Sequence, residues 1–95
     1  MPAYIITEID VTDPVRYEDY KKMSLAAVQA YGGRFIVRGG AAETLEGHWV
    51  PKRVVVVEFP TPAIARAWWG SPEYAAAKKL RQETSNTRMI VVDGV

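Results

Sequence analysis

Hydrophobic and polar residues alternate at the start of the chain. From Ala3 to Val11 the odd-numbered positions are apolar or threonine, which is the period of a β-strand with one buried face. Residues 53–60 read Arg-Val-Val-Val-Val-Glu-Phe-Pro, a run rich in β-branched residues and too short for a typical helix. A half-exposed strand would alternate, so the consecutive valines predict a central strand in a sheet covered on both faces.

Three other stretches have strand-like composition: Arg34–Arg38, Ala41–Leu45 and Met89–Val92. Gly39-Gly40 predicts a bulge or bend between the first two. Within Arg34–Arg38, alternation places Phe35 and Val37 on the helix-facing side and Arg38 on the other side. We expect the third stretch to follow a turn at Asn86.

Three helix starts carry the same signal, an N-cap residue followed by proline: Asp13-Pro14, Thr61-Pro62 and Ser71-Pro72. Glycines after the first two helices predict their ends, at Gly32-Gly33 and at Gly70. The first helix has a stripe of aromatic and small residues that predicts packing against a sheet. Its members are Tyr17, Tyr20, Ser24, Ala27, Val28 and Tyr31.

The order of these elements predicts an α+β fold of the ferredoxin-like βαββαβ type, with a four-stranded antiparallel sheet and the helices on one face. With 95 residues the chain is long enough for one domain, residues 1–95, and too short for two. The opposite face of such a sheet would present roughly 400 Å², and here it is largely apolar. We therefore expect a homodimer through the sheet face.

Composition excludes several classes of protein. The net charge is +1 without a basic block, so we expect no nucleic acid and no membrane as partner. RNA-recognition modules share the βαββαβ order but carry stacking aromatics on the exposed sheet, where this chain has valines. No cysteine is present, which excludes disulfides and thiolate chemistry and favours a cytoplasmic location. One histidine and no carboxylate motif predict no metal site and no cofactor.

Several short segments spread over nearly the whole chain carry a family resemblance. They are Tyr31-Gly32-Gly33-Arg34-Phe35, Val37-Arg38-Gly39-Gly40, Glu46-Gly47-His48-Trp49 with Pro51, Val57-Glu58-Phe59-Pro60, Trp68-Trp69 and Ser71-Pro72-Glu73-Tyr74. With them the chain resembles the domain of unknown function 1330 family, of the dimeric α/β-barrel superfamily. The resemblance implies the fold and the dimer, while the family's reaction is not established. The wider superfamily includes cofactor-free monooxygenases acting on polycyclic phenols, small-molecule isomerases and haem enzymes, which offer analogy only.

Two sets of residues are candidates for catalysis. His48 lies between predicted strands and has the side chain best suited to act as a general base near neutral pH, although without an orienting partner a structural or solvated role fits it better. Arg38 is expected to meet Glu8 and Glu58 on the outer face. Such a cluster would either bind or deprotonate a small substrate, or fix the register of two sheets by ion pairs.

A crevice between helices and sheet is the candidate for ligand binding. Aromatic walls with a few polar tips are the usual composition of a small-molecule pocket, although helical spacing also fits ordinary core packing. The sequence thus favours a small protein that is either a cofactor-independent enzyme or binder for a small aromatic or carbonyl compound, or a non-enzymatic dimeric ligand-binding or structural protein. The residues expected to line the crevice are Tyr17, Tyr20, Trp68, Tyr74 and Arg81.

Overall fold

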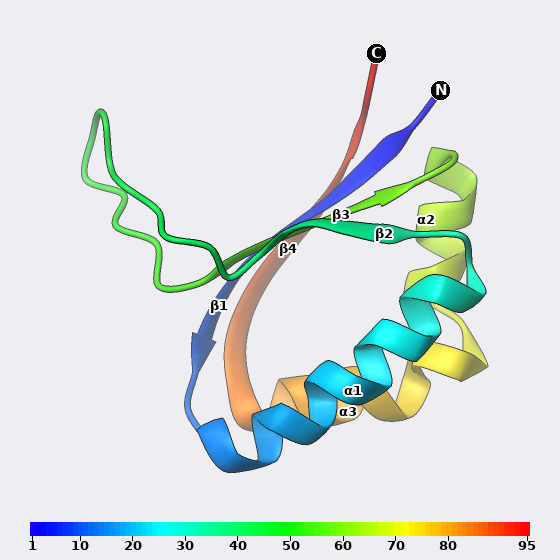
Figure 1. The fold of residues 1–95 in the computed structure, drawn as a ribbon, viewed down its shortest axis with the longest axis horizontal. Helices are drawn as coiled ribbons and strands as arrows, with labels where there is room; N and C mark the ends of the chain where they lie inside the picture. Colours follow the sequence, from blue (N-terminus) through cyan, green and yellow to red (C-terminus); the bar gives the residue numbers. More distant parts are fainter.

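The computed structural model describes residues 1–95 and shows one four-stranded antiparallel sheet with three helices on one of its faces (Figure 1). The strands are ordered β2-β3-β1-β4, so the valine strand β3 is central as predicted. This is the βαββαβ arrangement, with the second helical segment split in two. The elements are β1 (Ala3–Val11), α1 (Pro14–Ala30), β2 (Arg34–Arg38), β3 (Val54–Phe59), α2 (Pro62–Trp69), α3 (Pro72–Thr84) and β4 (Ser85–Asp93).

Each helix begins at its predicted cap. The backbone N–H three residues on donates to the cap side chain, at 3.2 Å for Asp13, 3.1 Å for Thr61 and 3.1 Å for Ser71. A proline follows each cap, where its missing N–H leaves no hydrogen bond unmade. These caps satisfy backbone donors that the helices cannot satisfy themselves.

The core lies between the helices and the inner face of the sheet. The predicted α1 stripe is buried apart from Tyr31, which is half-buried. An aromatic group fills the centre, with the Trp68 ring 4.2 Å from that of Tyr74 and 5.2 Å from that of Phe59, measured between centroids. These three aromatic side chains therefore fill the centre of the core between the helices and the sheet.

One bulge changes the side on which two predicted residues lie. Phe35 pairs with Val57, but the next paired residue of β2 is Val37, opposite Val56, so Ile36 is the extra residue. A bulge of one residue reverses the alternation beyond it. Val37 therefore lies on the outer face and Arg38 on the inner face, the reverse of the prediction, and the bulge lies before rather than at Gly39-Gly40.

Two further predictions about the strands are wrong, the start of the last strand and the existence of a strand at Ala41–Leu45. β4 begins at Ser85, directly after α3, so Asn86 is a strand residue and not a turn. Ala41–Leu45 forms no strand. It belongs to residues 39–53, a long loop between β2 and β3 that we call the arm, which projects away from the body (Figure 1). No helix combines the length and the apolar character needed to cross a membrane.

Candidate functional site

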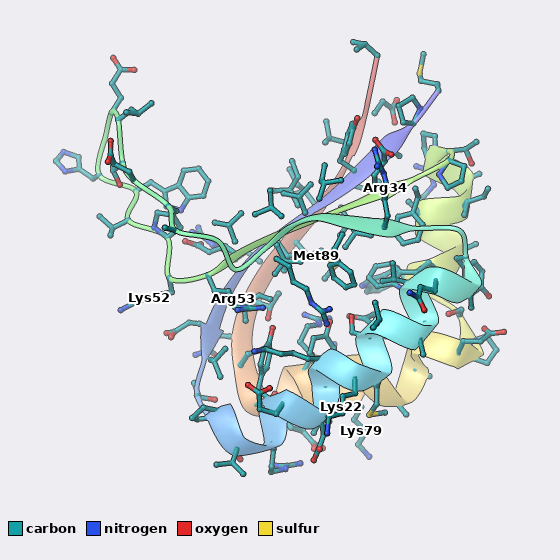
Figure 2. All side chains as sticks on the ribbon, in the orientation of Figure 1. Lys22, Arg34, Lys52, Arg53, Lys79 and Met89 are labelled. Carbon is teal, nitrogen blue, oxygen red and sulfur yellow. The ribbon has the colours of Figure 1, made fainter.

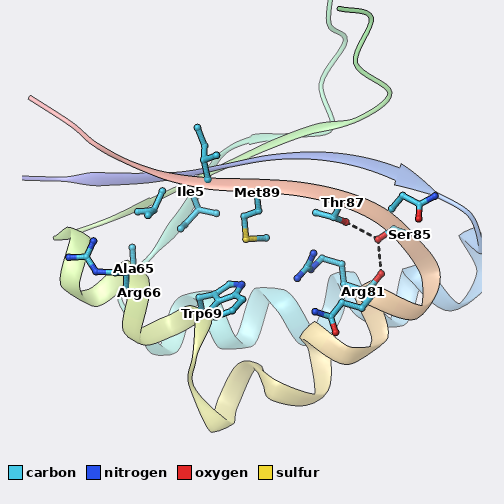
Figure 3. A pocket seen from close by; sticks show the side chains of 12 residues that line it. Ile5, Ala65, Arg66, Trp69, Arg81, Ser85, Thr87 and Met89 are labelled. Carbon is cyan, nitrogen blue, oxygen red and sulfur yellow. Dashed lines mark hydrogen bonds between the residues drawn. The ribbon is translucent and has the colours of Figure 1, made fainter.

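An open cleft of about 680 Å³, the β4 cleft, lies between β4, α2 and the last turn of α3 (Figure 3). β4 is an edge strand, and the helices leave part of its inner side uncovered. Val91 pairs with the inner residue Ile5, yet it is 39% exposed. The cleft is lined by Ile5, Ala65, Arg66, Trp69, Arg81, Gln82, Ser85, Asn86, Thr87, Met89, Ile90 and Val91, and this lining contains no carboxylate.

Arg81 is the exceptional residue of the β4 cleft. It is only 5% exposed, its guanidinium makes no ion pair or hydrogen bond, and its Nε is buried without a partner. The side chain extends from α3 into the cleft (Figure 3). Its position in the last turn of α3 supplies partial negative charge from the helix end. A buried donor without a partner is costly, and a cation held among few polar groups favours an anion beside it, so an anionic or carbonyl oxygen in the cleft would satisfy Arg81.

Hydroxyl groups hold the backbone beside Arg81 in place. The Ser85 Oγ donates to the Arg81 carbonyl at 2.6 Å and is 3.0 Å from the Thr87 Oγ1 (Figure 3). The Thr84 Oγ1 donates to the Leu80 carbonyl at 2.8 Å. These bonds join the end of α3 to the start of β4, so Arg81 stands on a rigid junction.

The opposite wall of the cleft is aromatic. Trp69 is half-exposed at the end of α2, and the Lys78 ammonium lies 3.9 Å from its ring centroid and donates to its carbonyl at 3.0 Å. This cation–π contact fixes the ring. Met89 adds a flexible apolar side chain that adapts to a ligand's shape.

The other four residues predicted for the crevice lie in the core. Tyr17, Tyr20 and Trp68 surround an inner cavity of only about 20 Å³, enough for one water molecule. Tyr74 is fully buried, and its hydroxyl oxygen lies 2.7 Å from that of Tyr20. Of the five predicted residues, only Arg81 lines the open cleft.

The inner cavity is nevertheless electropositive. Lys21, Arg38 and Arg53 line it and no carboxylate does. The Arg53 guanidinium lies 5.8 Å from the Tyr17 ring centroid, and its Nε is buried without a partner. Burial raises the pKa of Tyr17 and Tyr20 above that of an ordinary tyrosine, with the neighbouring tyrosine hydroxyls adding to the effect. Both tyrosines therefore stay neutral, and the Tyr20 hydroxyl shares a hydrogen bond with that of Tyr74.

The predicted cluster of Glu8, Arg38 and Glu58 does not form. Because of the bulge, Arg38 lies on the inner side, where it donates to the Lys21 carbonyl at 2.8 Å. Figure 2 shows Arg34 on the side of the sheet facing away from α1, and its Nε donates to Glu58 at 2.9 Å. This contact, with a further one from Tyr4, lowers the pKa of Glu58.

Glu8 is paired separately, at the other end of the outer face. The Trp49 indole donates to it at 2.8 Å and the Arg88 Nε at 2.9 Å, and these two contacts lower its pKa. His48 stands on the arm, exposed, and makes no hydrogen bond or ion pair. The three predicted catalytic candidates are therefore spread over separate places, and none lines the β4 cleft.

Several cleft residues were missed by sequence reasoning. Ser85 and Thr87 were not predicted to lie in a strand, because Asn86 was interpreted as a turn. The alternation of Thr87, Met89 and Val91 with polar or outward positions could have extended the strand backwards. Trp69 gave no signal, because its neighbour Trp68 already fitted the apolar edge of the helix.

The fold and the cleft together define a ferredoxin-like α+β protein with an arginine buried in the wall of a small-molecule-sized cleft. No three histidine, aspartate or glutamate side chains gather where they could hold a metal ion. The chain belongs to the family called domain of unknown function (DUF1330), whose model matches residues 2–95. This confirms the resemblance seen in the sequence. No curated protein matches the chain.

Solved structures share the fold at low identity. A protein of unknown function from Rhodopseudomonas palustris is 19% identical with a TM-score of 0.79, over 99% of this chain and 82% of that one. A dimeric ferredoxin-like protein of unknown function from Jannaschia sp. is 11% identical with a TM-score of 0.75, over 99% and 100%. SnoaB, a cofactor-independent oxygenase from Streptomyces nogalater, is 11% identical with a TM-score of 0.69, over 99% and 93%. These likenesses confirm the fold.

Proposed function

We propose that this protein binds a small aromatic or carbonyl compound in the β4 cleft, where Arg81 holds an oxygen atom that carries negative charge. The observation that supports this most is that Arg81 is 5% exposed, forms no ion pair and has a buried Nε without a partner, in a cleft whose lining has no carboxylate. Trp69 and Met89 would contact the rings of a planar ligand. The volume of about 680 Å³ suits a compound of two or three fused rings.

As an enzyme, the protein would be a cofactor-independent oxygenase or isomerase acting on the phenolate or enolate of its substrate. Arg81 would stabilise that anion, which lowers the pKa of the bound phenol or enol. The likeness to a cofactor-independent oxygenase supports this choice by analogy of fold.

A non-enzymatic ligand-binding role is the second candidate, and one observation favours it. The cleft contains no histidine and no carboxylate, hence no side chain that could take a proton from a ligand near neutral pH. A phenol bound here would lose its proton to solvent, through the open side of the cleft. Turnover of a bound phenol under oxygen separates the two roles.

Binding is tested with 2-naphthol and with 2-methoxynaphthalene, which has the same rings but cannot ionise. Calorimetry should show the wild type preferring 2-naphthol increasingly as the pH rises toward the naphthol's own pKa. Arg81→Met should weaken naphthol binding about 10- to 100-fold, because a hydrogen bond to a charged group contributes about 1.5–3 kcal/mol. Binding of 2-methoxynaphthalene should change little.

Arg66→Met is the matched control, since Arg66 also lines the cleft but is exposed. It should leave the preference for 2-naphthol in place. Equal affinity of wild type and Arg81→Met for 2-naphthol would refute the role of Arg81. Failure to bind any of a series of phenols, quinones and lactones would refute the ligand site itself.

We also propose that two copies pair through the outer faces of their sheets. The outer face carries exposed Ile90 and Val92 beside half-buried Ile6, Val54 and Val56. An apolar face of this extent is rarely left in water. Fold neighbours from Jannaschia sp. and Bacteroides fragilis are dimeric proteins, which supports the proposal.

A further inference from the structure

The arm, residues 39–53, carries three large apolar side chains that remain largely exposed in their own subunit. Leu45 is 89% exposed, Val50 is 76% exposed and Trp49 is 57% exposed. Every residue from 39 to 50 is exposed. Single exposed apolar residues are ordinary, but three on one projecting loop form a surface that favours contact with another molecule.

Polar contacts give the arm a defined shape. At its base the Gly39 N–H donates to the Val54 carbonyl at 2.9 Å, and the Arg53 carbonyl accepts from the Ile9 N–H at 2.8 Å. Further out, the Thr44 Oγ1 donates to the Trp49 carbonyl at 2.6 Å. The arm is therefore held in place by hydrogen bonds that leave its apolar side chains free.

The Trp49 indole joins the arm to the outer face through its bond to Glu8. Between arm and sheet lies an open groove of about 630 Å³, with Ile6 and Ile90 at its sheet side. The apolar surface of the arm is thus continuous with the apolar surface of the outer face. A molecule that covers the sheet would also meet the arm.

The arm enlarges the apolar surface that the sheet offers to a partner. The strands have nine, five, six and nine residues, so the sheet covers roughly 460 Å² in projection. A stable protein interface buries about 800 Å² of accessible surface on each partner. The arm is the exposed apolar segment adjoining the sheet, so it would add to the surface that a partner buries (Figure 1).

A second copy of this chain is the occupant that the observations favour. Fold neighbours from Jannaschia sp. and Bacteroides fragilis are dimeric proteins. Two copies paired by a two-fold axis through their outer faces would bring each arm toward the other subunit's sheet. The exposed arginines of the outer face, Arg34 and Arg88, already pair with Glu58 and Glu8 of their own subunit, so the arm would meet the partner mainly through its apolar side chains.

We infer that the arm clasps a second copy of the chain and supplies part of the dimer interface, with Leu45, Trp49 and Val50 contacting the partner subunit. This inference rests on the proposed pairing of the outer faces. It adds that the arm lowers the dissociation constant of the dimer. Residues 41–50 are all exposed and contribute nothing to the core, so variants within them keep the fold.

The test is the dimer dissociation constant of the full chain, measured by sedimentation over a range of concentrations. Leu45→Ser/Val50→Ser and a chain with residues 41–50 replaced by Asn-Gly should each dissociate at about tenfold higher concentration or more. Val15→Ser is the matched control, because Val15 is an 80% exposed valine on α1, away from the outer face. Val56→Glu on the sheet face should give a monomer.

The outcomes separate the two proposals. Unchanged dissociation of both arm variants, with Val56→Glu monomeric, overturns the role of the arm and leaves the sheet-face dimer standing. Weakened arm variants with a dimeric Val56→Glu overturn the sheet-face pairing and retain the arm as an interface. A wild-type chain that is monomeric at about 100 μM overturns both. Circular dichroism of each variant confirms that it is folded.

Discussion

Replacing Arg81 by methionine should stabilise the ligand-free protein. Arg81 is 5% exposed, its guanidinium has no partner, and its Nε is fully buried. Methionine keeps the unbranched stem and the packing but removes the charge. The substitution therefore tests whether the guanidinium is retained at a cost to stability, as binding residues often are.

The expected change in the free energy of unfolding of Arg81→Met follows from two opposing contributions. An unsatisfied buried donor costs about 1–3 kcal/mol, which the methionine would recover. The favourable interaction of the cation with the end of α3 is worth about 0.3–1 kcal/mol and would be lost. The net gain is about 1–2 kcal/mol in the free energy of unfolding. For a chain of this size that raises Tm by roughly 5–10 °C.

Urea unfolding and calorimetry of the ligand-free protein measure this effect. Protein concentration must be fixed across variants, because association would raise the apparent stability. Arg66→Met, at an exposed position of the same cleft, should change the free energy of unfolding by less than about 0.5 kcal/mol. If Arg81→Met loses more than 1 kcal/mol, the guanidinium stabilises the fold and the reasoning behind the ligand site is wrong.

Three further predictions concern the fold. Gly33→Ala should cost about 1–3 kcal/mol, because its Cβ would lie 2.6 Å from the Phe59 ring, whereas Gly40→Ala, with no atom within 4 Å, should be nearly neutral in urea unfolding. Tyr20→Phe should cost about 1–3 kcal/mol by leaving the Tyr74 hydroxyl unpaired, and the double Tyr20→Phe/Tyr74→Phe variant should lose less than the two single costs added. The lowered pKa of Glu8 means that its contribution to stability is present above its unfolded pKa of about 4.3 and lost as pH falls through the folded value. As the pH falls below about 4.5, stability should thus fall less steeply in Glu8→Gln than in wild type.

Local sequence signals predicted most of the fold. Each cap-plus-proline pair lies at the start of a helix, because the cap hydrogen bond and the fixed proline backbone act within four residues. The buried stripe of α1 followed from its helical period. Such features need no knowledge of distant parts of the chain.

The candidate site was harder to predict, because it depends on register and on uncovered surface. The bulge at Ile36 places Arg38 on the inner face, so the expected cluster of Arg38 with Glu8 and Glu58 does not form. No pattern in Arg34–Arg38 marks such an insertion. Helical spacing correctly placed Tyr20 and Arg81 toward the sheet, but it could not show that one fills the core while the other borders a cleft.

The two uncovered surfaces lie on opposite sides of the sheet, and this decides how they can work together. The outer face is broad and apolar, which suits a protein surface. The β4 cleft opens on the helix side and contains one buried cation, which suits a small anionic ligand. Pairing of the outer faces would cover the first surface without filling the second, since β4 turns Val92 outward and Met89 inward. Ile90 belongs to both surfaces, because it lies on the outer face and also borders the β4 cleft. A dimer of this kind would still keep two separate clefts, one in each subunit.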